Sequence, residues 1–166
     1  MSERDTGAAH RQVEYAGAVY GSLLAASVVA GSTAEGGPPS ASELVVLLIC
    51  TGVVFWITHV YAQLVSRGHP ARFAWASARG VARQEWPLAQ ASFFPAIAAA
   101  LTSAAGASDT VAAWAALCAA VASQVAWAVT AAVKTRSTTG VVIVSAITNL
   151  VLGLAIVALK TLVSAH

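Results

Sequence analysis

Long apolar runs alternate with short polar segments along the 166 residues of the chain. The clearest run, Leu44 to Val65, contains no Asp, Glu, Lys or Arg. At about 1.5 Å per residue, a helix of this length covers roughly 33 Å, slightly more than the hydrocarbon core of a bilayer. The whole pattern predicts an all-α bundle of five membrane-spanning helices, at residues 13–31, 43–66, 87–105, 110–133 and 139–160.

The third run is the weakest because Pro95 interrupts it. Proline has no backbone N–H, and its ring clashes with the carbonyl four residues earlier. We therefore expect this helix to be tilted, kinked or partly re-entrant.

The basic residues indicate how the helices are oriented. Segments that contain Lys and Arg alternate with segments that contain none; the basic residues are Arg4, Arg11, Arg67, Arg72, Arg79, Arg83, Lys134, Arg136 and Lys160. Since basic residues favour the cytoplasmic side, this alternation predicts a single membrane domain, residues 1–166, with the N-terminus inside and the C-terminus outside. A four-helix arrangement without the Pro95 run would place Lys134 and Arg136 on the external side.

The composition excludes an ordinary water-soluble protein. Hydrophobic residues make up 58% of the chain and charged residues 10%, against about 25% charged residues in soluble domains. The N-terminus is read as part of a retained first helix rather than a signal peptide, because Glu3, Asp5 and Glu14 surround its start. We expect an integral protein of the plasma membrane, or of the cytoplasmic (inner) membrane if the source is prokaryotic.

An amphipathic cytoplasmic segment is predicted at residues 69–86. At 100° per residue its arginines and tryptophans fall on one stripe, and the opposite side holds Ala74, Val81 and Glu85. The stripe is a candidate contact for lipid headgroups or anions, and the alternative is a positive loop with anchoring tryptophans. Its members are Arg72, Arg79, Arg83, Trp75 and Trp86.

Several polar side chains lie within the apolar runs, where lipid contact would be costly. They are candidates for an internal permeation or gating stripe open to the cytoplasm: Glu14, Tyr20, His59, Gln63, Gln124 and Asn149. His59 is the strongest candidate for a gate or proton sensor, because imidazole changes charge near neutral pH. The alternative is that these groups only form hydrogen bonds between helices.

The first run contains Gly17-Ala-Val-Tyr-Gly21-Ser-Leu and ends in Ala30-Gly31, and the second has Tyr61 near its cytoplasmic end. In these features and in its five-helix topology the chain resembles the vacuolar iron transporter family, also called nodulin-like iron and manganese transporters. That resemblance implies a membrane transporter. The family's acidic metal ligands are missing: Tyr20 stands at the acidic position before Gly21, the second run offers His59 and Gln63, and the segment after it is basic.

The sequence thus favours a small transporter or channel, forming a homo-oligomer, that moves a cation or proton. The alternative is an accessory or scaffold subunit that binds another membrane protein. No enzyme is expected, because HExxH, GxSxG and paired-carboxylate patterns are lacking. The isolated Cys50 and Cys118 suggest no metal site, and neither a cofactor nor a nucleic-acid partner is expected beside the bilayer.

Overall fold

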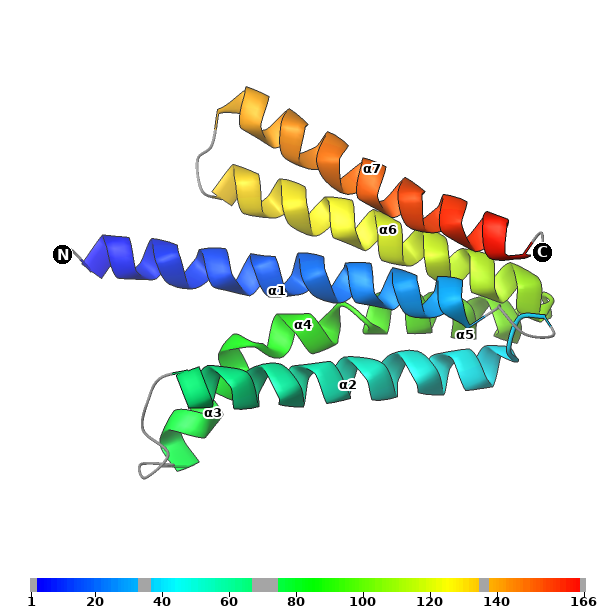
Figure 1. Ribbon diagram of the computed structural model, residues 1–166, viewed down its shortest axis with the longest axis horizontal. Helices are drawn as coiled ribbons and strands as arrows, with labels where there is room; N and C mark the ends of the chain where they lie inside the picture. Colours follow the sequence, from blue (N-terminus) through cyan, green and yellow to red (C-terminus); the bar gives the residue numbers. More distant parts are fainter. Residues whose placement is uncertain (1–2, 33–36, 67–74, 135–137, 165–166) are drawn as a thin grey trace.

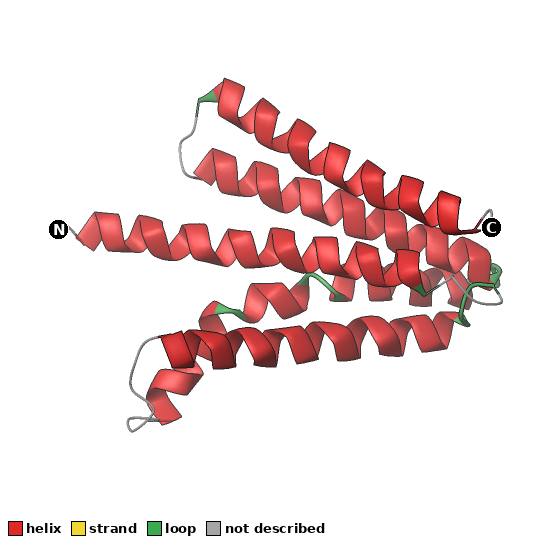
Figure 2. Ribbon diagram, in the orientation of Figure 1, coloured by secondary structure: helices red, strands yellow, loops and turns green. Residues whose placement is uncertain are grey.

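The computed structural model describes residues 3–32, 37–66, 75–134 and 138–164. All regular structure in these ranges is helical (Figure 2), which confirms the predicted all-α class. The helices are α1 (Glu3–Gly31), α2 (Ala41–Ser66), α3 (Trp75–Gln84), α4 (Trp86–Gln90), α5 (Phe93–Ala104), α6 (Asp109–Lys134) and α7 (Thr139–Ser164).

The long segments lie side by side and successive ones run in opposite directions (Figure 1). The helix α1 packs mainly against α6 and α4, α5 packs against α6 and α2, and α7 packs against α6. The two chain ends lie at opposite ends of the bundle, and α3 lies at the same end as the N-terminus (Figure 1).

Three helices among the described residues are long and apolar enough to cross a membrane: Ala41–Ser66, Asp109–Lys134 and Thr139–Ala158. Five had been predicted. In α1, which begins at Glu3 rather than residue 13, the strongly apolar part is the shorter stretch Gly17–Gly31. The predicted third helix is divided into α4 and α5, neither of which reaches the length of a bilayer core.

Pro95 accounts for the interruption between α4 and α5. It has no N–H for the carbonyl of Ala91, four residues earlier. At the break the Ser92 N–H donates to Ala89 O, three residues earlier, at 3.1 Å. This turn is tighter than the preceding α-helical turn, in which the Ala91 N–H donates to Pro87 O, four residues earlier, at 3.2 Å. Regular α-helical bonding resumes when the Ala96 N–H donates to Ser92 O at 3.2 Å. We refer to Ala91–Ser92 as the helix break.

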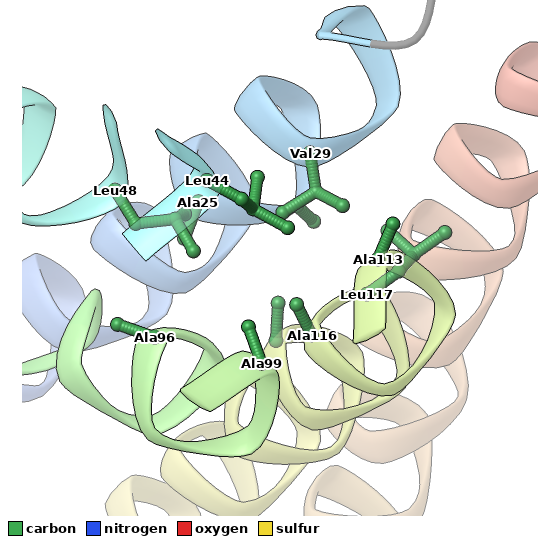
Figure 3. Packing of buried hydrophobic residues seen from close by; sticks show 11 residues of the cluster. Ala25, Val29, Leu44, Leu48, Ala96, Ala99, Ala113, Ala116 and Leu117 are labelled. Carbon is green, nitrogen blue, oxygen red and sulfur yellow. The ribbon is translucent and has the colours of Figure 1, made fainter. Parts of the chain in front are cut away.

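The apolar core lies where α1, α2, α5 and α6 meet (Figure 3). Alanine dominates it, and the larger side chains Val29, Leu44, Leu48 and Leu117 fill the space between the helices. Small residues let helix backbones approach closely, which compensates for the absence of a hydrophobic driving force between helices inside lipid.

Hydrogen bonds from side chains fix the start of α2. Ser40 and Glu43 form a capping box, in which the Glu43 carboxylate accepts from the Ser40 N–H at 2.9 Å and the Ser40 hydroxyl accepts from the Glu43 N–H at 3.3 Å. The carboxylate of Asp109, in the first turn of α6, accepts from the Ala41 N–H at 2.9 Å. Asp109 therefore connects the N-termini of two helices that are distant in sequence.

We expect Asp109→Ala to destabilise the protein by about 1 kcal/mol, because the α2 N-terminus loses an acceptor and a favourable negative charge. Thermal unfolding in detergent should show a fall in Tm of about 2–4 °C. Asp109→Asn, which keeps an acceptor oxygen, should lose less. Equal Tm values for the wild type and Asp109→Ala would contradict the proposed role of this contact.

Candidate functional site

Three consecutive residues of α1 face three different neighbours. The Tyr20 ring lies 6.3 Å from the His59 ring of α2, centroid to centroid. A Cβ on Gly21 would lie 2.5 Å from the Leu88 carbonyl oxygen of α4. The Ser22 hydroxyl accepts from the Ser123 hydroxyl of α6 at 3.2 Å. Successive helical residues rise by only about 1.5 Å, so these contacts share one level of the bundle.

Gln124 extends this level to α7. Its amide Nε2 donates to the Asn149 backbone oxygen at 3.3 Å and to Asn149 Oδ1 at 3.2 Å. The Asn149 amide in turn donates to Ser145 O at 2.9 Å, which orients its oxygen towards Gln124. We call this set the polar layer; it consists of Tyr20, Ser22, His59, Ser123, Gln124 and Asn149.

Gln124 is fully buried, with an exposed fraction of 0%, as is Ser22. Its Oε1 atom has no hydrogen-bond partner among the described residues. An unsatisfied buried acceptor costs about 1–3 kcal/mol. The position therefore carries a polar group at the expense of stability.

The predicted stripe residues separate into two groups. Tyr20 and Ser22 are two residues apart, so their side chains point about 200° apart around α1. The Tyr20–His59 pair consequently lies on one side of α1, where Tyr20 is 44% exposed, and the Gln124–Asn149 pair lies on the other. The sequence alone had suggested a single longitudinal stripe, whereas the structure arranges these groups across the bundle.

The remaining two stripe candidates lie outside the layer. Gln63 is half-buried, one turn beyond His59 on α2. Glu14 belongs to α1, but its side chain lies outside the described part of the structure.

A small cavity adjoins the helix break. It has a volume of about 10 Å³, close to the space that one water molecule needs, and its lining includes Gly21, Thr51, Gly52, Leu88 and Ser92. Because the Ser92 N–H donates to Ala89 O, the Leu88 carbonyl lacks the helical donor four residues ahead. The break thus places the Leu88 carbonyl oxygen and the hydroxyl-bearing side chains of Thr51 and Ser92 beside a cavity whose other side chains are apolar, namely Leu24, Ala25, Val28, Leu48 and Phe55.

Glu85 is a candidate that the sequence analysis did not include among the site residues. It is only 3% exposed, and its Oε2 lies 4.0 Å from the position of a Cβ on Gly17. The helical pattern had placed Glu85 together with Val81 on the side opposite the arginines. That shared position was a sequence signal for the burial of Glu85, because Val81 is also buried.

The Arg/Trp stripe is present only in part. Arg79 and Arg83 are exposed and Trp75 is 80% exposed, whereas Arg72 lies outside the described residues. The stripe does not continue to Trp86, because α3 ends at Gln84 and the helical phase changes before α4.

Trp86 belongs to an aromatic cluster at this end of the bundle. Its ring packs edge-on against Trp56 at 5.3 Å and lies 6.1 Å from the Phe93 ring. Trp56 Nε1 donates to Ala82 O at 2.9 Å, which ties α2 to α3. Among the described residues, the predicted contact with lipid headgroups therefore consists of Arg79, Arg83 and Trp75.

Within the described ranges, no group of three or more His, Cys, Asp and Glu residues could hold a metal ion. Cys50 and Cys118 are free and exposed on the helix surfaces. Comparison with known protein families, curated proteins and solved structures found no match to this chain.

Proposed function

We propose that this chain is a small integral membrane transporter or channel that moves a proton or small cation through the polar layer. The observation that carries the proposal is the position of that layer beside the helix break, with the Leu88 carbonyl at Gly21. Discontinuous helices form ion sites in many transporters, because their unwound carbonyls are free to bind ions.

The buried polar groups support the same proposal. Ionisable and amide side chains within apolar helices are costly to keep away from water. They mark ion pathways or proton relays more often than polar side chains on the protein surface do. Glu85 lies close to Gly17 of α1, and His59 lies close to Tyr20 of the same helix. Gly17 and Tyr20 are less than one helical turn apart. We propose that Glu85 and His59 form the entrance to the layer.

Charge supports an orientation with a cytoplasmic N-terminus. The basic side chains Arg79, Arg83 and Lys134 belong to the end of the bundle that holds α3, and the acidic Glu43 and Asp109 belong to the other (Figure 1). By the positive-inside rule the α3 end is cytoplasmic. The Leu44–Leu48 core then closes the external half, and transport requires this core to open.

A homo-oligomer is part of the proposal. Most side chains of α7 face outward, and the cavity beside the break has room for about one water molecule. A path for an ion would therefore be completed by contacts between subunits.

Reconstitution in liposomes tests the proposal. We expect wild-type protein to dissipate a proton or monovalent-cation gradient, and His59→Ala to reduce flux to the level of protein-free liposomes. Thr58→Ala is the matched control, because Thr58 is adjacent, exposed, and bonded only to its own helix at Val54 O. Equal Tm values for the two variants would show that a loss of flux is not a loss of folding.

Two outcomes would contradict the proposal. Flux by His59→Ala equal to that of wild type would remove His59 from the path. Absence of flux by wild type, together with purification in constant stoichiometry with a second membrane protein, would instead favour an accessory or scaffold subunit. The tightly packed alanine core is the observation that favours this second function.

A further inference from the structure

A long apolar groove lies on the outer surface between α5 and α6, apart from the helix break. Its volume is about 470 Å³. Ala119, Ala122 and Ala126 contribute small side chains to its lining, Phe94 and Trp127 contribute aromatic rings, and Thr130 lies at the end towards the α6 C-terminus.

The groove follows from the interrupted third segment. Beyond the break, α5 packs against α6, whereas α4 packs chiefly against α1 and α2. The C-terminal half of α6 is therefore left uncovered on the side where α4 turns away. The exposed Ala122 and Ala126 lie in this half.

The length of the groove corresponds to one leaflet of a bilayer. From Ala119 to Thr130, α6 rises by about 16 Å, and half of the hydrocarbon core is about 15 Å. The volume lies within the usual range for sites of small elongated ligands. A helix segment of the same length and about 10 Å in diameter would need roughly 1,200 Å³, so the groove accommodates a single hydrocarbon chain better than a helix.

Charge at one end of the groove indicates the headgroup. Lys134 is exposed and lies four residues after Thr130, hence on the same face of α6 one turn further on. A chain that fills the groove would place its polar end at this ammonium group. Anionic lipids gain favourable interaction with basic side chains at the membrane surface.

We propose that the α5–α6 groove binds one acyl chain of an anionic phospholipid, whose phosphate contacts Lys134. The site is independent of transport. It requires only that the chain be embedded in a bilayer.

Native mass spectrometry of delipidated protein, titrated with phosphatidylglycerol or phosphatidylcholine, tests the proposal. We expect one tightly retained lipid and about fivefold tighter binding of phosphatidylglycerol, the factor that corresponds to one basic residue at the surface. Ala126→Phe should fill the groove and abolish this binding. Leu101→Phe is the control, because Leu101 lies on α5 outside the groove and is 66% exposed. Lys134→Gln should remove the preference between the two lipids.

A second measurement covers the case in which Ala126→Phe fails to fold. Lipids brominated on the acyl chain should quench Trp fluorescence, and Trp127→Phe should remove more of the quenched signal than Trp114→Phe, which lies on α6 outside the groove. Equal effects of the two Trp variants, or equal lipid binding by wild type and a folded Ala126→Phe, would overturn the proposal. So would a lipid-free dimer that Ala126→Phe disrupts, because a second copy would then be the occupant.

Discussion

Gly21→Ala is expected to lower the stability of the bundle by about 2–3 kcal/mol, the upper part of the range for overpacking in a closely packed core. The new Cβ would lie 2.5 Å from the Leu88 carbonyl oxygen and 3.0 Å from the Ala91 Cβ. The closest obstacle is backbone, so no side-chain rotation relieves it. Helices α1 and α4 would have to separate at the level of the polar layer.

Gly52→Ala should cause a similar loss from the other side of the helix break. Its Cβ would collide with the Ser92 hydroxyl and lie 2.8 Å from the Ser92 Cβ. Ser92 is almost fully buried, which leaves it little room to move. The two substitutions act on one contact region, so their effects should add incompletely.

Thermal unfolding followed by circular dichroism in detergent would measure both effects. Gly31→Ala is the matched control, since it lies in the same helix as Gly21 and has no neighbour within 4 Å of its added Cβ. It should unfold at or slightly above the wild-type temperature, because alanine favours helix more than glycine does. A Gly21→Ala protein as stable as Gly31→Ala would contradict the close packing of α1 on α4.

Gln124→Leu is expected to raise stability slightly, by about 1 kcal/mol, while abolishing transport. The substitution removes two long hydrogen bonds to Asn149, and such bonds in membrane proteins average about 0.6 kcal/mol. It also removes Oε1, whose unsatisfied burial costs about 1–3 kcal/mol. Leucine keeps nearly the same volume, so the interior remains filled.

Gln124→Ala should behave differently, losing about 2–3 kcal/mol because it leaves a cavity at a fully buried site. Comparing the two variants by Tm and liposome flux separates packing from function. Thr148→Val, a change from polar to apolar at the exposed neighbour of Asn149, is the control and should retain flux. If Gln124→Leu were stable and fully active, Gln124 would serve only as a contact between helices.

Local periodicity determined much of the helical structure. The runs predicted at 43–66, 110–133 and 139–160 correspond to α2, α6 and α7 within a few residues at each end, because a long apolar run can satisfy all its backbone hydrogen bonds within a single helix. The helical pattern placed Val81 and Glu85 on the side opposite the arginines, and both are buried in the structure.

What periodicity left open is which neighbour each face meets. Tyr20, Gly21 and Ser22 differ by about 100° per residue in any helix, but only the packing of α1 among α2, α4 and α6 assigns them to His59, Leu88 and Ser123. Helix phase also continues only while the helix does. Because α3 ends at Gln84, Trp86 does not lie on the same stripe as Arg79 and Arg83.

The sequence by itself determined an all-helical chain whose apolar runs suit a bilayer, because hydrophobic length and helical period are local properties. Tertiary structure decided where Pro95 breaks the third segment, that Gln124 pairs with Asn149, and that Glu85 lies buried near Gly17. Those features depend on contacts between residues far apart in the chain. Helix packing, rather than residue spacing, creates them.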